Sequence, residues 1–106
     1  MAEKPFVKES QSVDKLRYTL IEPEFKRAMA SILTQGAKKY DAHNWKKCED
    51  KDMYKDALLR HLEAYLSGEY LDEEMQESHL ASIACNAMFL LHMEQRERNE
   101  QQPSNS

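Results

Sequence analysis

The scarcity of glycine and proline constrains this chain more than any other feature of its sequence. Its 106 residues include 2 glycines and 3 prolines, whereas strong helix formers such as Ala, Leu, Met, Glu, Lys and Gln are plentiful. A β-sandwich or barrel needs many tight turns, and those turns draw mainly on glycine and proline. We therefore predict an all-α fold with few loops, and a single domain because this length leaves no room for a second core.

Hydrophobic spacing predicts a small helical bundle of three main helices. Pro23 suits the first position of a helix, apolar residues follow at intervals of three and four, and Gly36 can end it. A second helix is expected over about 53–67, with a glycine near its end, and a third over about 77–98. The segment 37–52 lacks a clean period but carries a Trp, a Tyr and an Asn, so we interpret it as a structured, functional connection.

The limits of the folded unit follow from polarity. Residues 1–12 and 99–106 cannot bury enough apolar surface to offset the entropy of ordering them, so we expect a flexible N-terminal segment and a disordered C-terminal tail around a domain over 13–98. The third helix is apolar over most of its circumference, and three helices make a thin core. A second copy of the chain is expected to cover the remainder, which predicts a homo-oligomer, either a dimer or a tetramer.

Charge and composition exclude several functional classes. The net charge is −4, so the chain has no basic excess for direct nucleic-acid binding. Its longest apolar stretch, 81–91, is interrupted and too short to span a membrane, and we expect a cytoplasmic protein. Cys48 and Cys85 do not form a C-x-x-C pair and are expected to be reduced. No Gly-rich phosphate loop or G-x-S-x-G motif occurs, which leaves metal-assisted chemistry or a binding module without chemistry.

An acidic turn follows the second predicted helix. Glu69 and Asp72 form an E-x-x-D motif, which would bring two carboxylates to one side of a helical turn, and hard cations such as Mg²⁺ bind such oxygens. His61 shares a sector of the preceding helix with the apolar Leu58 and Leu62. The alternative interpretation is that the helix ends before the motif and that the acidic turn is solvated.

Polar residues also occur on the third predicted helix. His79 and Asn86 are two turns apart and share a face, with Ser82 beside them. They can face the acidic turn, or His79 can pack near the helix start while Asn86 makes a buried amide hydrogen bond. A zinc site made of His79, Cys85 and His92 is disfavoured because the three do not share a face.

Several of these residues belong to blocks that occur in a characteristic order. The blocks are Leu20-Ile-x-Pro23, Gly36-Ala-Lys-Lys-Tyr40 with Asn44-Trp45, Arg60-His61, Gly68-Glu69-x-x-Asp72-x-Glu74, and His79-Leu-Ala with Cys85-Asn86. In this order they resemble a phage-associated family of dATP/dGTP diphosphohydrolases, which is similar to the MazG-like all-α nucleotide pyrophosphohydrolases. The resemblance spans about residues 14–91.

The resemblance implies an oligomeric helical enzyme that uses Mg²⁺ or Mn²⁺ to cut purine deoxynucleoside triphosphates between the α and β phosphates. Clustered carboxylates suit this reaction because a bound cation screens phosphate charge and lowers the pKa of the attacking water. Metal ligation is implied for Glu69, Asp72 and Glu74, and catalytic roles are implied for Glu74, His61 and His79. The implied substrate contacts are Lys39, Tyr40, Asn44, Trp45, Arg60 and Asn86.

The chain departs from the family pattern beside the predicted site. Met75 and Gln76 stand where the pattern has Ser-Gly, and Ser82 stands where a second histidine often follows in His-x-x-His. These departures can alter metal preference, substrate or turnover. Two non-enzymatic hypotheses therefore accompany the enzymatic one. The first is a helical adaptor that binds a host or phage partner through the Met-rich face around Met88 and Leu91, and the second is a nucleotide-binding protein without catalysis.

Overall fold

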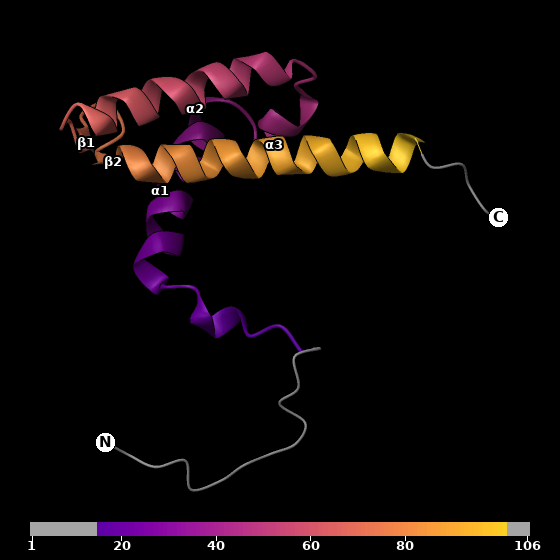
Figure 1. Ribbon diagram of the computed structural model, residues 1–106, viewed down its shortest axis with the longest axis horizontal. Helices are drawn as coiled ribbons and strands as arrows, with labels where there is room; N and C mark the ends of the chain where they lie inside the picture. The colour runs from indigo at the N-terminus through magenta and orange to yellow at the C-terminus, as the bar shows by residue number, and fades with distance from the viewer. Residues whose placement is uncertain (1–14, 102–106) are drawn as a thin grey trace, which may run out of the picture.

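The computed structural model describes residues 15–101 as three long helices joined by short elements (Figure 1). In chain order these are the 3₁₀ helix η1 (Tyr18–Leu20), helix α1 (Pro23–Lys39), the 3₁₀ helix η2 (Asn44–Lys47), helix α2 (Lys51–Leu66), strand β1 (Leu71–Asp72), strand β2 (Glu77–Ser78) and helix α3 (His79–Gln101). The predicted all-α class with three main helices is confirmed.

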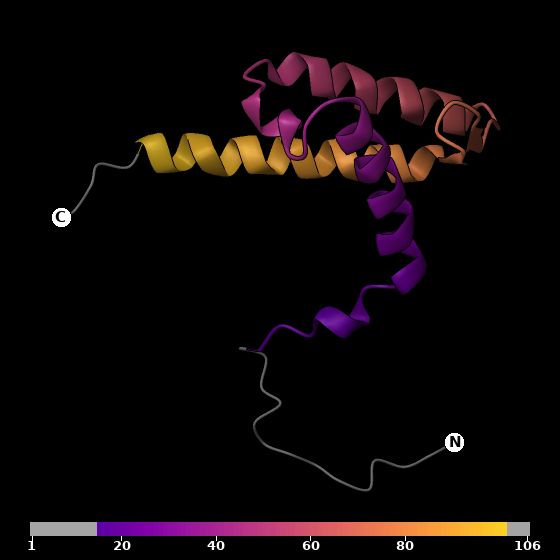
Figure 2. The ribbon, with the colours of Figure 1, turned by 180° about the vertical axis from the view of Figure 1, so that it is seen from behind.

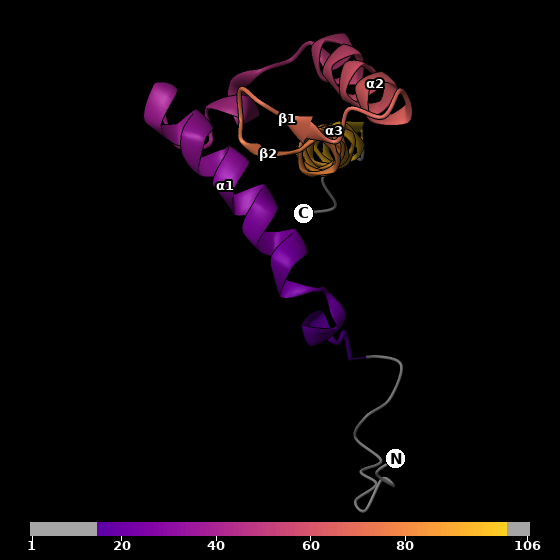
Figure 3. The ribbon, with the colours of Figure 1, turned by 90° about the vertical axis from the view of Figure 1, so that its left-hand side faces the viewer.

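Helices α2 and α3 lie side by side and antiparallel, and α1 crosses α3 (Figures 2 and 3). The connection between α1 and α2 is held against α3 by hydrogen bonds and an ion pair. Arg96 donates to the carbonyl oxygens of Lys46 and Cys48, at 3.0 and 3.3 Å. The Lys51 ammonium pairs with the Glu97 carboxylate at 2.9 Å. The connection is therefore structured, as its composition predicted.

Helix α1 begins at Pro23 as predicted but does not end at Gly36. It continues to Lys39, and the amide of Tyr40 donates to the Gly36 carbonyl oxygen at 2.8 Å. An interior glycine costs about 1 kcal/mol relative to alanine. The three residues that follow it, Ala-Lys-Lys, are strong helix formers, and the two lysines are favourable at a helix C-terminus. Gly36 is therefore an interior residue of α1, which corrects the predicted helix end.

Helix α2 has a capped start. The Asp50 carboxylate accepts a hydrogen bond from the amide of Asp52 at 3.1 Å, the usual contact of an N-cap residue. The helix begins at Lys51, slightly before the predicted start near Met53. Capping by a short acidic side chain explains the earlier start, because it satisfies an amide that lacks a partner within the helix.

The end of α2 is set by Gly68, whose φ is +99°. The amide of Gly68 donates to the carbonyl oxygen of Tyr65, and that of Glu69 donates to the carbonyl oxygen of Ala64, both at 3.0 Å. These two bonds form a Schellman motif, in which a residue with positive φ reverses the chain after a helix. Glu69 and Asp72 therefore do not share a helical turn, which corrects the geometry predicted from the E-x-x-D spacing.

A two-stranded hairpin precedes α3, and the sequence pattern did not predict it. Its strands are antiparallel, and the paired residues are Leu71 with Ser78 and Asp72 with Glu77. Gln76 adopts a left-handed conformation in the turn, with φ 55°, and its amide donates to the Asp72 carbonyl oxygen at 2.7 Å. Strands of two residues are too short to show alternation in a sequence. Because β2 takes up Glu77 and Ser78, α3 begins at His79 and not near residue 77.

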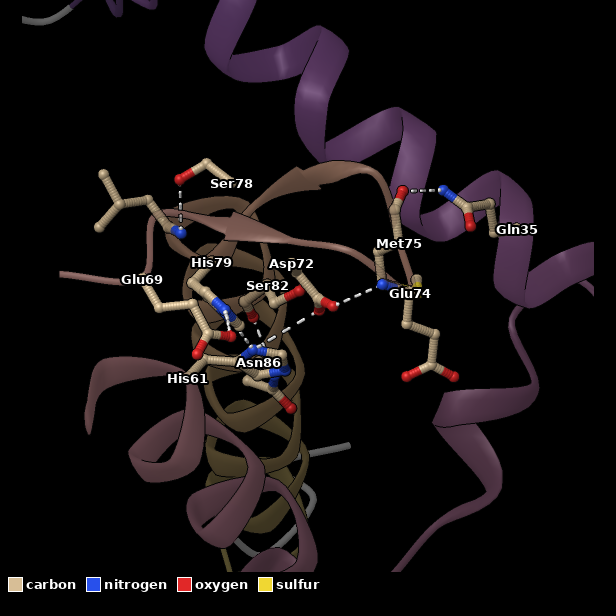
Figure 4. Close-up of polar contacts among 11 residues, drawn as sticks. Gln35, His61, Glu69, Asp72, Glu74, Met75, Ser78, His79, Ser82 and Asn86 are labelled. Atoms are coloured by element: carbon tan, nitrogen blue, oxygen red, sulfur yellow. Dashed lines mark hydrogen bonds and ion pairs between the residues drawn. The ribbon is translucent and has the colours of Figure 1, made fainter. Parts of the chain in front are cut away.

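Helix α1 holds the hairpin through two long-range contacts. The Arg27 guanidinium donates to both carboxylate oxygens of Glu77, at 2.9 and 3.2 Å. The Gln35 side-chain amide donates to the Met75 carbonyl oxygen at 2.9 Å (Figure 4). These contacts position the turn between β1 and β2 relative to the helices.

The described residues bury little apolar surface. The buried apolar residues are Tyr54, Ala81, Cys85 and Met93, and α1 contributes none of its own. Large apolar side chains of η1, of the residues that flank it and of the start of α1 are exposed, among them Leu16, Tyr18, Leu20, Ile21 and Phe25. The Cα radius of gyration is 18.2 Å, whereas a compact domain of about this length has about 13 Å. Helix α1 therefore projects from the α2–α3 pair.

The C-terminal end of α3 lies beyond its predicted limit. The helix continues to Gln101, and an ion pair between Arg98 and Glu94 at 3.0 Å supports its last turns. The predicted flexible segment 1–12 and residues 102–106 of the predicted tail lie outside the described residues. Within residues 15–101, no helix is long and apolar enough to cross a membrane. The cytoplasmic location stays a prediction.

Candidate functional site

Three polar side chains from three different elements converge at one end of the α2–α3 pair (Figure 4). They are His61 of α2, Asp72 of β1 and His79 at the start of α3. One ligand atom from each lies within 4.8 Å of the others. Their side chains are 23%, 13% and 7% exposed, respectively, so water reaches the group but does not surround it. A partly buried group of imidazoles and a carboxylate is the kind of donor set that holds a divalent cation.

The two histidines face each other through the same ring atom. His61 Nδ1 lies 2.8 Å from His79 Nδ1, and it lies 3.9 Å from Asp72 Oδ2. Glu69 Oε2 lies 3.1 Å from His79 Nε2, on the other side of that ring. An ionised carboxylate can only accept, so Nε2 of His79 carries the hydrogen and its Nδ1 has a free lone pair in the neutral ring. In this arrangement His61 Nδ1 donates to His79.

The Schellman motif at the end of α2 explains the position of Glu69. It turns the chain back after Gly68, so that Glu69 reaches the buried His79 ring although the Glu69 side chain is 65% exposed. The structure thus gives Glu69 a contact with the histidine and leaves it out of the donor group, which contains Asp72 as its carboxylate. The metal-ligand role implied for Glu69 is not supported by this geometry.

Asp72 is oriented by the hairpin turn. Its Oδ1 accepts a hydrogen bond from the backbone amide of Glu74 at 3.1 Å, which leaves Oδ2 directed at His61. The Glu74 side chain extends away from the group into solvent (Figure 4). The structure therefore places the Asp72 carboxylate in the donor group and leaves the Glu74 carboxylate outside it.

The electrostatic surroundings keep His61 neutral near neutral pH. Burial lowers the pKa of His61 below its ordinary value, and the Asp72 carboxylate opposes this shift. Positive charge on His79 or on the adjacent Arg60 lowers the pKa further. A neutral imidazole is the form that binds a metal ion.

Other predicted site residues lie next to this group or farther along the molecule. Asn86 is buried on α3 and donates to the Ser82 carbonyl oxygen at 2.8 Å, on the side of the helix that faces the histidines (Figure 4). This is the buried side-chain amide hydrogen bond that was one of the two alternatives that the sequence left open for Asn86. Arg60 is exposed on α2 beside His61.

The residues predicted to bind the base or sugar do not join the histidine group. The Trp45 ring stacks on Phe89 with centroids 4.7 Å apart, and His92 meets its edge at 5.1 Å. Tyr40 is exposed, with the Lys39 ammonium 5.6 Å from its ring centre. Contact with Phe89 occupies one face of the Trp45 ring and gives Trp45 a structural role, and its stacking on a base stays a prediction.

These residues border a separate cavity of about 1000 Å³ between the end of α1, the η2 segment and α3. Tyr40, Asn44 and Trp45 line it together with apolar side chains of α1 and α3, whereas Lys39 does not. Met75, in the hairpin turn that carries Asp72, also reaches the wall of this cavity. The turn is therefore the element that the histidine group and the cavity share.

Sequence patterns did not indicate two contributors to this site, Arg27 and Gln35, and they indicated a different role for a third, Glu69. Glu69 orients a histidine, and Arg27 and Gln35 hold the hairpin from α1. The partners of Arg27 and Gln35 are 50 and 40 residues away in the chain, so no local spacing could indicate them. For Glu69, the glycine before it was the available signal, because a glycine just after a helix commonly reverses the chain.

Comparison with protein-family models gives one match that covers most of the chain. Residues 7–103 match the family described as dATP/dGTP diphosphohydrolase, N-terminal. The chain belongs to this family. No curated protein and no solved structure matched the sequence in the corresponding searches. The name of the dATP/dGTP diphosphohydrolase family implies hydrolase activity, and this family is the one that the sequence motifs resemble.

Proposed function

We propose that this protein hydrolyses dATP or dGTP to the deoxynucleoside monophosphate and pyrophosphate, with a divalent cation bound by the histidine group. The observation that carries the proposal is the convergence of His61, Asp72 and His79 from three separate elements in a protein of the dATP/dGTP diphosphohydrolase family. Burying polar side chains is costly, and apolar residues would pack better at these positions, so the group is better explained by binding than by packing.

The proposed reaction is attack of water on the α phosphorus with loss of pyrophosphate. A bound cation would screen the phosphate charges and lower the pKa of the attacking water. The protein's own contribution is to orient the donors: Glu69 holds the His79 ring, and the amide of Glu74 holds Asp72. The Glu74 carboxylate extends from the same turn into solvent but is near enough to raise the pKa of His61, and we propose that it accepts a proton from water as the predicted general base. Arg60 and Asn86 are proposed to contact the phosphates or sugar.

A pyrophosphate-release assay tests this proposal. The protein is incubated with each of the four deoxynucleoside triphosphates and Mg²⁺, Mn²⁺, Co²⁺ or Zn²⁺, and monophosphate and pyrophosphate are measured. We expect turnover of dATP or dGTP, reduced at least about 100-fold by Asp72→Asn, a loss typical of a disabled catalytic group. The control is Glu63→Gln, which removes an exposed carboxylate on the same helix as His61 and should leave the rate unchanged. Absence of pyrophosphate from every purine substrate would contradict the proposal.

A binding role without chemistry is the second candidate, and the apolar cavity favours it. Met88 and the exposed Leu91 both line the cavity, which lies apart from the histidine group. Under this hypothesis Leu91→Glu abolishes capture of a protein partner while Asp72→Asn has no effect. A nucleotide-binding protein that has lost catalysis would instead be stabilised by a purine nucleotide with metal and release no pyrophosphate.

We also propose that the protein works as a homo-oligomer. Exposed apolar side chains of η1 and α1, including Tyr18, Leu20 and Phe25, form a surface that a second copy can bury. Helix α1 has no buried residue of its own, which supports this proposal. Light scattering coupled to size-exclusion chromatography should give the mass of a dimer or tetramer, and Phe25→Glu should shift it toward that of one chain. A wild-type mass of 12.5 kDa would contradict it.

A further inference from the structure

We propose that His61, Asp72 and His79 form a site for a nitrogen-preferring divalent ion, such as Zn²⁺ or Co²⁺, in preference to Mg²⁺. The role of this ion in hydrolysis rests on the proposed function, but its binding does not. The donor atoms carry the inference: two imidazole nitrogens and one carboxylate oxygen lie within 4.8 Å of one another. Imidazole suits zinc and its first-row neighbours, whereas Mg²⁺ selects oxygen ligands and holds several waters.

The count of available carboxylates argues against a magnesium site. Glu69, Asp72 and Glu74 were all expected to supply oxygens, but the structure brings Asp72 alone into the group. Glu69 contacts the far nitrogen of His79, and the Glu74 side chain extends into solvent. With a single carboxylate and two histidines, we expect the group to bind Mg²⁺ weakly, because Mg²⁺ prefers oxygen ligands and gives up its bound waters reluctantly.

Glu69 gives the group the feature of a metal site that a chance pair of histidines lacks. Histidines that bind metals commonly donate their other ring N–H to a carboxylate, which orients the ring and makes the bound nitrogen more basic. Glu69 Oε2 lies 3.1 Å from Nε2 of His79, and Nδ1 of the same ring points into the group. Glu69 is therefore a positioning residue for a histidine ligand.

The distance between the two nitrogens is compatible with an ion after a small adjustment. His61 Nδ1 and His79 Nδ1 are 2.8 Å apart, which is a hydrogen-bond distance. Two nitrogens on a tetrahedral ion, each about 2.0–2.1 Å from it, are about 3.3 Å apart. His61 is only half-buried on α2 and can shift by this amount. Its other neutral tautomer, with the hydrogen on Nε2, then presents the Nδ1 lone pair.

Cobalt binding in the absence of nucleotide tests the inference directly. The purified protein is freed of metal and titrated with Co²⁺, while visible d–d absorption reports the number and type of ligands. We expect one equivalent to bind, Zn²⁺ to displace it stoichiometrically, and Mg²⁺ in large excess to leave the spectrum unchanged. Displacement of Co²⁺ by Mg²⁺ at a similar concentration, or the absence of any binding, would overturn the proposal.

Matched variants separate this site from incidental histidine binding. His61→Ala and Asp72→Asn should each weaken Co²⁺ binding at least about tenfold, and Glu69→Gln should weaken it about 10–100-fold, as other variants of metal-orienting carboxylates do. The control is His43→Asn, which removes an exposed loop histidine. His43 has a left-handed backbone conformation, which asparagine tolerates, so this variant should bind Co²⁺ as the wild type does. Equal affinity in all four variants would refute the assignment. Circular dichroism of each variant confirms that it is folded.

The outcomes distinguish this inference from the proposed function. If the protein hydrolyses a purine nucleotide with Mg²⁺ but fails to bind Co²⁺ through these residues, the inference is wrong and the function stands. If Co²⁺ binds as described but no nucleotide is cleaved with any metal, the metal site is supported and the proposed hydrolysis is wrong.

Discussion

The two glycines of this protein should respond to the same substitution with opposite signs. Gly68 has a φ of +99° at the end of α2, whereas Gly36 lies inside α1 with a helical backbone. A Cβ atom added at either position would meet no atom within 4 Å. Steric clash with neighbours therefore contributes nothing, and the substitution to alanine measures backbone conformation alone.

The expected magnitudes follow from these conformations. Alanine in a left-handed backbone costs about 1–2 kcal/mol, so Gly68→Ala should lower the free energy of unfolding by that amount. Alanine in a helix interior is better than glycine by about 0.8–1 kcal/mol, so Gly36→Ala should raise it. With a denaturant slope of about 1–2 kcal/mol/M, Gly68→Ala should lower the urea midpoint by about 0.5–2 M.

Urea unfolding followed by far-ultraviolet circular dichroism measures both effects. All three proteins are compared at one concentration, because the stability of an oligomer depends on concentration. A Gly68→Ala variant as stable as the wild type would refute the Schellman geometry that places Glu69 beside His79. A destabilised Gly36→Ala variant would show that Gly36 ends the helix, as the sequence pattern first suggested.

Three further predictions concern residues outside the donor group. The Arg27 guanidinium, through its hydrogen bonds, holds the pKa of Glu77 below its ordinary value. The pair therefore stabilises the protein at pH values above the ordinary pKa of a glutamate, and this stabilisation is lost as the pH falls through the lowered pKa. Urea midpoints of wild type and Glu77→Gln should thus differ at neutral pH and converge in acid, and a constant difference would contradict this. Burial raises the pKa of Cys85 to about 11, so a thiol reagent at neutral pH should label Cys48 quickly and Cys85 only after unfolding; equal rates would be inconsistent with the buried thiol. Trp45→Ala should lower the free energy of unfolding by about 2–4 kcal/mol through lost packing, measured by urea unfolding, whereas a loss of nucleotide affinity at unchanged stability would favour the base-binding role instead.

Much of the fold was predictable because it depends on local signals. The helix formers, the opening proline of α1 and the glycine after α2 act over a few residues, and each indicated an element that the structure contains. The boundaries were less predictable. Gly36 is a typical stop signal, yet helix-forming neighbours and packing against α3 keep the helix going past it. The hairpin was missed because its strands have only two residues each.

The residues of the candidate site were also partly predictable. Spacing indicated that His61 and His79 interrupt apolar helix faces, and acidity indicated Asp72. The prediction assumed that all acidic residues of the turn gather around one cation, whereas the donor group in the structure contains Asp72 without the Glu69 and Glu74 carboxylates. In the structure a backbone amide and a reversal at Gly68 sort them into one donor, one positioning residue and one solvent-exposed side chain.

The sequence by itself determined that this chain is helical, which three segments form its main helices, and that imidazole and carboxylate groups interrupt their apolar faces. Those features follow from the intrinsic preferences of neighbouring residues. Only the tertiary structure decided which carboxylate meets the two histidines. That choice depends on the orientation of the hairpin, which α1 holds through Arg27 and Gln35 across 50 and 40 residues of chain. Contacts between segments so far apart leave no local pattern, because they depend on how the helices pack.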